Sequence, residues 1–328
     1  MPLSRSLKLL LNYVVGPLLF VLIGASIYQQ VTADDQLEYH WQHLQQQANS
    51  HGWTWLVAMV GLMACNWGLE SLKWYTLINH VMKASLWRAF KSVLTGVSFT
   101  MLTPNRMGEF LGRVLQLPDG SRVRSATLTL IGSISQLKVT MVAGAIGILW
   151  MKSQAAVQEQ WPTLLMNALL FGTLAGLALL ALVYFNIGWF IRQAEKWKPA
   201  ARYVPYVHAI GEIGATELMK ILALSLARYA VFLCQYWLVF KYLGLPVSTV
   251  NLLAATSVMF LILAVVPTIS LAELGVRGKV SLFVFSFYVA DSLGILVSTA
   301  MVWVINIILP AIAGSLLLLG VTLFAKNE

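Results

Sequence analysis

The fold is decided by a short stretch in the first half of the chain, Thr103–Glu109, which reads Thr-Pro-Asn-Arg-Met-Gly-Glu. It separates two apolar runs, Ser92–Leu102 and Val114–Leu117, that are each much shorter than the ~20 residues a helix needs to cross a bilayer. Pro104 removes a backbone donor and disfavours helical geometry at the preceding residue, and Gly108 lets a backbone or a ligand come close. The stretch predicts a broken, re-entrant membrane segment.

A second stretch, Pro267–Gly278, repeats this pattern in the other half of the chain. Each stretch has a proline, then a glutamate and an arginine four residues apart: Glu109 with Arg113, and Glu273 with Arg277. Residues four apart share one face of a helix and can pair. Paired interruptions in corresponding places indicate a transporter-type binding site. The predicted breaks lie at Pro104, Gly108, Pro267 and Gly275.

The composition excludes an ordinary soluble fold. The 328 residues are 59% hydrophobic and 11% charged, as expected of a membrane protein. The net charge of +9 could suggest nucleic acid as a partner, but the basic residues lie beside apolar runs, and membrane topology explains them better. Cys65 and Cys234 lie inside apolar segments, so we expect buried free thiols without a disulfide.

We predict an all-α polytopic membrane protein with about six full spans and two re-entrant broken-helix hairpins. With this topology, 16 of the 22 Lys and Arg residues lie on the same side of the membrane as the two termini. Because cytoplasmic loops carry an excess of Lys and Arg, we expect both termini to be cytoplasmic. The first apolar run has 19 residues, longer than the ~7–15 of a signal peptide, so we expect it to be retained. Pro310 is expected to kink the last span. The predicted spans are Leu9–Ile27, Trp53–Ile78, Ala126–Met151, Thr163–Phe185, Lys220–Lys241 and Gly294–Phe324.

The order of these segments predicts an internal repeat. Each half contains span, span, hairpin and span, and an odd number of crossings inverts the second half. We therefore expect one integral membrane domain, 1–328, made of pseudo-repeats at about 7–151 and 163–324. Glu109 and Glu273 are 164 residues apart, half the length of the chain. The two hairpins of such a repeat are expected to meet near the midplane.

Charged residues inside the membrane are costly, so each is a candidate for function. The simpler alternative is that they pair with one another and only satisfy the broken backbone; for the two glutamate–arginine pairs we weigh both interpretations equally. Arg228 and Lys138 lie inside full spans, and a guanidinium suits a phosphate group. The predicted substrate-binding residues are Arg106, Glu109, Arg113, Lys138, Arg228, Glu273 and Arg277.

The sequence offers little for an enzyme. The spans hold no histidine that could activate a serine, and the chain has no Walker-type glycine loop or cluster with metal-ligand spacing. His40 and His43 could bind a metal, but a solvated, partly helical loop over Gln29–Gly52 is the better interpretation. We expect no catalytic residues, no cofactor and no metal.

The two broken stretches, with Arg228 inside its span, resemble the flippase-like membrane domain of lysylphosphatidylglycerol synthases and its stand-alone bacterial and archaeal relatives. The second stretch has Leu271-Ala272-Glu273 before Leu274-Gly275, where the family usually has Pro-Gly-Gly-Leu-Gly. In those synthases the membrane part moves an aminoacylated phospholipid between leaflets, and a separate cytosolic domain makes it. This chain stops at Glu328, so we expect it to lack that domain.

The resemblance and the buried charges together favour a lipid translocase or lipid-binding carrier in the bacterial cytoplasmic (inner) membrane. Its expected partners are membrane lipids with an anionic or phosphate-bearing head group, and a lipid-modifying enzyme or a second copy of the chain are further candidates. The alternative is a non-transporting membrane partner that docks a lipid-modifying enzyme. An intramembrane lipid-processing enzyme is a third reading, which the missing nucleophile–base pair disfavours.

Overall fold

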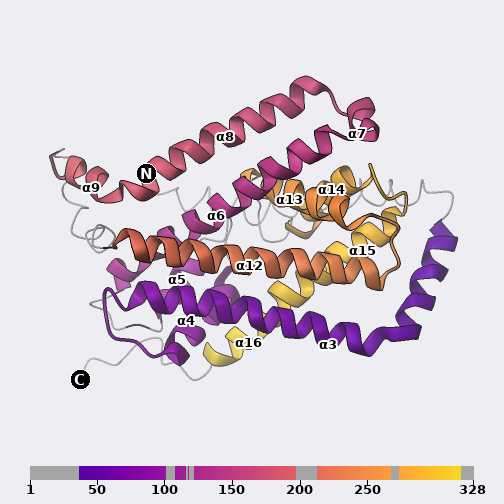
Figure 1. Ribbon diagram of the computed structural model, residues 1–328. Helices are drawn as coiled ribbons and strands as arrows, with labels where there is room; N and C mark the ends of the chain where they lie inside the picture. The colour runs from indigo at the N-terminus through magenta and orange to yellow at the C-terminus, as the bar shows by residue number, and fades with distance from the viewer. Residues whose placement is uncertain are drawn as a thin grey trace, which may run out of the picture.

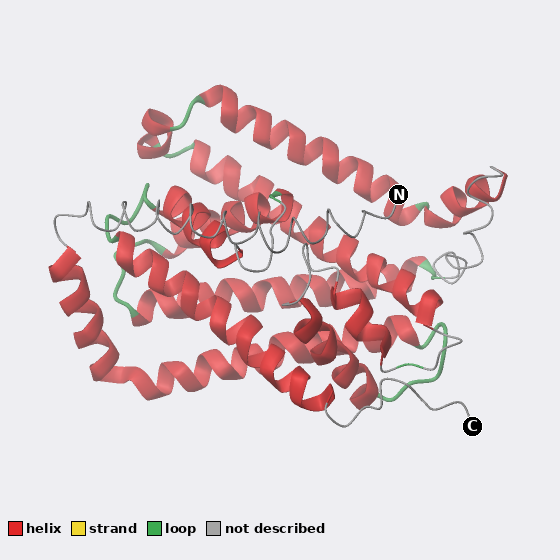
Figure 2. Ribbon diagram, turned by 180° about the vertical axis from the view of Figure 1, so that it is seen from behind, coloured by secondary structure: helices red, strands yellow, loops and turns green. Residues whose placement is uncertain are grey.

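The computed structural model describes residues 37–100, 108–115, 117, 122–196, 213–266 and 273–318. Every regular element in these ranges is helical, as the composition predicts, and Figure 2 shows the helices joined by loops. Up to residue 196 the elements are α3 (Leu37–Ile78), α4 (Leu86–Thr100), α5 (Gly108–Leu115), α6 (Arg122–Lys152), α7 (Ala155–Gln160), α8 (Thr163–Phe185) and α9 (Ile187–Lys196). From residue 213 on they are α12 (Ala215–Tyr242), α13 (Thr249–Val265), α14 (Glu273–Phe285), α15 (Ser292–Trp303), the π-helix η4 (Val304–Ile308) and α16 (Leu309–Leu318).

Four of the described helical stretches are long and apolar enough to cross a membrane. They agree closely with four of the predicted spans, and they make the protein a multi-pass membrane protein. The predicted span Lys220–Lys241 lies within α12, a helix of 28 residues that is not among these four stretches. The predicted span Leu9–Ile27 lies outside the described residues. Cys65 and Cys234 are free, as predicted, but both are exposed on the helix surface, so the expectation that they are buried is wrong. The four stretches are Trp53–Ile78, Thr127–Lys152, Thr163–Phe185 and Ser292–Leu317.

The two halves pack against each other along α3 and α12. These helices lie side by side and run in opposite directions (Figure 1). The other contacts between the halves follow one pattern: α13 packs on α6, and α16 packs on α4. Thus the first limb of each broken segment contacts the last membrane helix of the other half, as an inverted repeat would require. The repeat itself stays a prediction.

Close approach of the backbones holds the first broken segment together. α4 packs against α5, and Gly112 of α5 lies directly against α4. A Cβ atom on Gly112 would lie 2.6 Å from both the Gly96 Cα atom and the Thr95 carbonyl oxygen, so no larger residue fits. In the second segment α13 packs against α14 and also against α6, where Gly144 gives the space. A Cβ atom on Gly144 would lie 2.6 Å from the Leu261 Cβ atom, so glycine allows this close contact of α6 with α13.

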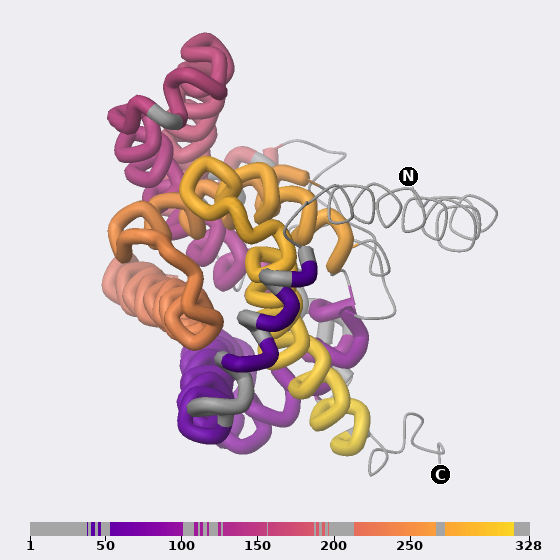
Figure 3. The backbone as a smooth tube through the Cα atoms, turned by 90° about the vertical axis from the view of Figure 1, so that its right-hand side faces the viewer, coloured from indigo at the N-terminus to yellow at the C-terminus, as the bar shows by residue number. Residues whose placement is uncertain are grey.

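The helix pair α6 and α8 forms the outer part of the molecule. Figure 3 shows α8 and the end of α6 projecting from the other described helices. Most of α8 is exposed, and its exposed side chains are apolar, as expected of a helix that faces lipid. The site described below lies on the other side of α6, among α3, α12 and the two broken segments.

Candidate functional site

Both glutamate–arginine pairs predicted from the sequence form within their helices. Glu109 lies in the first turn of α5, and its Oε1 accepts a hydrogen bond from Arg113 one turn later. Glu273 begins α14, and its Oε1 accepts from Arg277 Nε at 3.1 Å and Nη2 at 2.9 Å. Acidic side chains in a first helical turn also complement the helix dipole. Each broken segment therefore resumes as a helix whose first charges compensate each other.

Glu70 lies at the centre of a buried charge cluster. Its Oε1 accepts from Arg113 Nη2 at 2.7 Å, while its Oε2 binds Lys73 Nζ at 2.7 Å and Arg228 Nη1 at 2.7 Å. Glu70, Lys73 and Arg113 are each less than 5% exposed. A buried carboxylate is tolerated when its charge is compensated and its oxygens are hydrogen-bonded. This one residue of α3 thus fixes an arginine of the first hairpin and an arginine of α12.

A chain of amide side chains continues from Arg228 across the two halves. Arg228 Nε donates to Asn66 Oδ1 at 2.7 Å, and Asn66 Nδ2 donates to Asn306 Oδ1 at 3.2 Å. Asn306 Nδ2 in turn donates to Gln235 Oε1 at 2.9 Å. All three amide side chains are buried. The network joins α3, α12 and η4, and it places Asn306 beside the charged cluster.

The π-helix around Asn306 follows from Pro310. A proline has no N–H, so Pro310 cannot donate to the carbonyl of Asn306 four residues before it. The indole Nε1 of Trp67 donates to this carbonyl instead, at 3.2 Å. The backbone widens here, and Leu309 N–H bonds to the Val304 carbonyl five residues earlier. The predicted irregularity at Pro310 is thus a π-helical segment (Val304–Ile308) that turns Asn306 toward the site.

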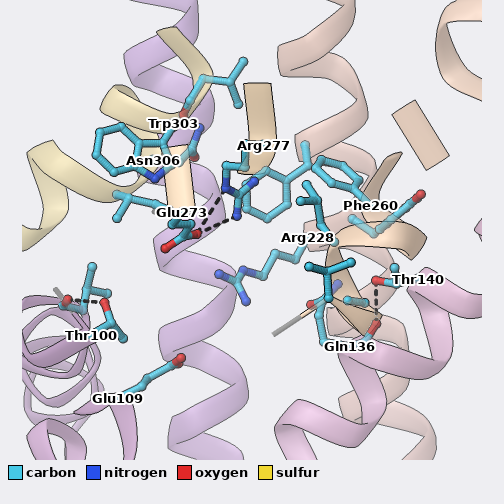
Figure 4. A pocket seen from close by; sticks show the side chains of 18 of the residues that line it. Thr100, Glu109, Gln136, Thr140, Arg228, Phe260, Glu273, Arg277, Trp303 and Asn306 are labelled. Carbon is cyan, nitrogen blue, oxygen red and sulfur yellow. Dashed lines mark hydrogen bonds and ion pairs between the residues drawn. The ribbon is translucent and has the colours of Figure 1, made fainter. Parts of the chain in front are cut away.

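These elements surround one cavity of about 540 Å³. Figure 4 shows Arg228 at its centre, the Glu273–Arg277 pair on one side and Glu109 on another. The guanidinium of Arg228 lies over the rings of Trp67 and Phe232, 5.2 and 5.5 Å from their centroids. Much of the remaining lining is aromatic or aliphatic. A cavity with apolar walls and a few charged groups suits a molecule that is itself amphipathic.

The structure brings four of the seven predicted site residues together around this cavity: Glu109, Arg228, Glu273 and Arg277. Arg113 lies behind them, between Glu109 and Glu70. Lys138 is not part of the cavity lining: its Nζ rests 4.1 Å from the ring centroids of both Tyr184 and Phe185 of α8.

The structure describes two of the four predicted break residues. Gly108 is the first residue of α5, and Gly275 lies in the first turn of α14. Arg106, Pro104 and Pro267 lie outside the described residues. That any of these residues binds a substrate stays a prediction.

Sequence reasoning missed part of the site. Asn66, Gln235 and Asn306 are polar residues inside apolar helices, and counting such residues would have found them, because a polar group within the membrane needs a partner. Glu70 lies near the end of a predicted span, and this position gives no hint of its three partners. The buried Asp291 has a structural role: it caps α15 by accepting from the Gly294 N–H at 2.7 Å.

The arrangement can bind a charged group. In the described residues no group of three or more His, Cys, Asp or Glu side chains could hold a metal ion. The charged groups of the cavity are paired arginines and glutamates, which suit recognition of an anionic or polar head group by charge-assisted hydrogen bonds. These features define the class of protein: in the part of the chain that the structure describes, an all-helical, multi-pass membrane protein with a charged cavity between its helices.

Comparison with known families identifies the family to which the protein belongs. The family described as the lysylphosphatidylglycerol synthase TM region matches residues 15–321, nearly the whole chain. The protein therefore belongs to this family, which connects it with membrane-lipid metabolism, and the resemblance seen in the two broken stretches is confirmed. Neither the curated proteins nor the solved structures compared with the chain gave a match.

Proposed function

We propose that the protein is a flippase-like lipid translocase or lipid-binding carrier of the bacterial inner membrane. The observation that carries this proposal is the cavity itself, because it collects charges from both broken segments and from the middle of α12. A lipid head group held there would be neutralised chiefly by Arg228, and its acyl chains would follow apolar helix surfaces. Rocking of one half against the other would expose the cavity alternately to the two leaflets.

The proposed role needs no covalent chemistry from this chain. The side chains around the cavity bind and orient by charge and hydrogen bonds, and we propose that the protein is not an enzyme. Membrane lipids are its proposed partners, with a lipid-modifying enzyme as a source or consumer of its cargo. A second candidate function, docking such an enzyme without transport, would leave the cavity charges with a structural role only.

The test is lipid translocation by the purified protein in vesicles of phosphatidylethanolamine and phosphatidylglycerol. Wild-type protein should accelerate exchange of a labelled anionic phospholipid between leaflets, and Arg228→Ala should slow it about tenfold or more, the usual effect of losing a buried charge partner. This variant should fold, because Glu70 keeps Lys73 and Arg113. Arg124→Ala, which removes an exposed charge, is the matched control.

The result that would overturn the proposal is equal exchange with and without wild-type protein. Equal rates for wild type and a folded Arg228→Ala variant would remove the site assignment. A stoichiometric enzyme partner retained by both proteins, without lipid exchange, would favour the docking function.

A further inference from the structure

The three carboxylates around the cavity differ in what depends on their charge. A proton on Glu70 would leave Lys73 and Arg228 without a carboxylate partner in the described residues. Glu273 Oε1 binds both Nε and Nη2 of Arg277, which has no second carboxylate partner there either. Neutralising either glutamate would strand a cation inside an apolar environment, which is costly. These two carboxylates are therefore expected to stay ionised.

Glu109 is the carboxylate that can lose its charge without this cost. Its ion-pair partner Arg113 also donates from the same Nη2 atom to Glu70 Oε1 at 2.7 Å, so Arg113 stays paired when Glu109 is neutral. The Glu109 side chain is also the most accessible of the three: it is 30% exposed, against 3% for Glu70 and 8% for Glu273. Within the described residues only its Oε1 accepts a hydrogen bond, which leaves Oε2 to take a proton.

The surroundings of Glu109 contain more cations than carboxylates. The part of α4 that packs on α5, Ser92–Thr100, has no titratable side chain. From α6 the uncharged Gln136 and Thr140 line the cavity, while Arg124 at the start of that helix is exposed. The titratable and charged groups that face Glu109 or its pair with Arg113 are Arg113 on α5, Glu70 and Lys73 on α3, Arg228 and the Tyr229 hydroxyl on α12, and Glu273 and Arg277 on α14.

This imbalance links the binding of a proton to the binding of an anion. With Glu109 ionised, four cations face three carboxylates in the described residues, so the empty site has one positive charge in excess. A proton would raise that excess to two, whereas in a site that already holds one negative charge it would raise the excess only to one. A proton and an anion therefore favour each other's binding, and the effect is reciprocal. A site with both carries the same charge as the empty site.

The geometry gives the proton a direct role at the anion. Figure 4 shows Glu109 reaching from the first broken segment toward Arg228. Arg228 uses Nε and Nη1 for Asn66 and Glu70, and its Nη2, which forms no bond with the described residues, can donate to a phosphate oxygen. An ionised Glu109 can only accept, so it repels that phosphate. Once Oε2 is protonated, its O–H can donate to the phosphate instead.

We propose that the protein moves a proton together with an anionic head group in the same direction, and that Glu109 carries the proton. This deepens the proposed function and rests on it. Glu109 Oε2 takes up the proton when the head group enters the cavity from one side of the membrane. It releases the proton when the head group leaves on the other side. No covalent bond of the lipid is made or broken, and Glu70 and Glu273 keep their charges throughout.

The test is the response of lipid translocation to a pH gradient. The purified full-length protein is placed in phosphatidylcholine vesicles with a trace of phosphatidylglycerol that is labelled on an acyl chain and whose phosphate is its only charge. Equal potassium on both sides with valinomycin holds the membrane potential at zero, and the outside is made one pH unit more acidic. The labelled lipid should accumulate in the inner leaflet up to about tenfold, the limit for one proton per lipid. Reversing the gradient should reverse the accumulation, and protein-free vesicles correct for spontaneous movement.

The variant Glu109→Gln tests the assignment of the proton to this residue. It resembles the protonated form, and it should fold because Arg113 keeps Glu70. Each protein is compared with itself with and without the gradient, so a changed basal rate does not matter. Glu109→Gln should give no accumulation, while the exposed control Glu159→Gln should accumulate the lipid as wild type does. If Glu109→Gln does not fold, the wild-type response to the gradient still decides.

Two kinds of failure can be told apart. Wild-type exchange that ignores the gradient, accumulation in the opposite direction, or accumulation that a folded Glu109→Gln variant retains would each overturn the coupling and leave the proposed translocase standing. Absence of any exchange by wild-type protein, with or without a gradient, would instead refute the proposed function.

Discussion

Glu70 is the residue on which the buried charges depend most. It binds three cations within 2.7 Å and is 3% exposed, so water cannot replace it. A salt bridge of this kind adds little stability compared with an apolar pair, but removing one partner is costly because charges are left buried without compensation. The structure therefore assigns Glu70 a positioning role for Arg113 and Arg228.

The first prediction concerns this residue. Glu70→Gln should lower the free energy of unfolding by about 3–5 kcal/mol, the usual loss when a buried ion pair is broken from one side. Adding Lys73→Met should recover part of the loss, because one stranded cation is removed. Thermal unfolding in detergent measures both. The control Glu217→Gln removes a carboxylate that is 41% exposed and pairs with His80, and it should cost about 0–1 kcal/mol. Similar losses for both glutamates would contradict the assignment.

A second prediction at this scale concerns the carbonyl of Asn306. Trp67→Phe removes the indole donor, and because Pro310 has no N–H, the carbonyl should lose its only described side-chain donor at a cost of about 1–3 kcal/mol. In a Pro310→Ala background the new backbone N–H can serve that carbonyl, so the same substitution should cost less. The two changes should therefore be coupled in a double-mutant cycle of unfolding free energies. Strict additivity would show that Trp67 does not compensate for the proline.

At the scale of elements, the broken segments depend on glycine contacts. Gly112→Ala places a Cβ atom 2.6 Å from the backbone of α4, so the two limbs must separate. We expect a loss of about 1–3 kcal/mol in unfolding free energy, typical of overpacking, together with weaker lipid binding because Glu109 and Arg113 move with α5. Gly172→Ala is the control: nothing lies within 4 Å of its added Cβ on exposed α8. If both changes have the same small effect, the limbs are not tightly packed.

Much at this scale could be predicted from the sequence. Proline, glycine and charge located the broken segments, apolar length located the spans, and the spacing of four residues predicted the pairs in α5 and α14. The hydrogen bonds of Glu70 could not be predicted, because its partners are 3, 43 and 158 residues away and only the packing of α3 against α12 brings the last of these close. The position of Lys138 could not be predicted either. Its depth in a span suggested that it binds substrate, but it lies on the face of α6 that contacts α8.

At the scale of the whole molecule, helices of each half pack against helices of the other half. α16 packs on α4 and α13 packs on α6, while α3 and α12 pair along their length. Neither half can bury these surfaces alone. Fragments 1–204 and 205–328 produced together should therefore assemble and co-purify with a melting temperature near that of the intact chain, and each produced alone should be degraded or aggregate. A first fragment that melts alone at the temperature of the whole protein would refute this interdependence.

The contact between α4 and α16 also has a consequence for synthesis. The Ser98 hydroxyl donates to the Ala311 carbonyl at 2.7 Å, and the two residues are 213 positions apart in the chain. At the usual ~5–20 residues per second, the ribosome needs roughly 10–40 s to supply that partner after α4 has emerged. During this interval the Ser98 hydroxyl lacks the Ala311 acceptor and can bond only to the Leu94 carbonyl of its own helix, at 3.3 Å. Biogenesis should therefore be the step most sensitive to cold, to slow codons before residue 311, and to loss of the membrane insertion machinery.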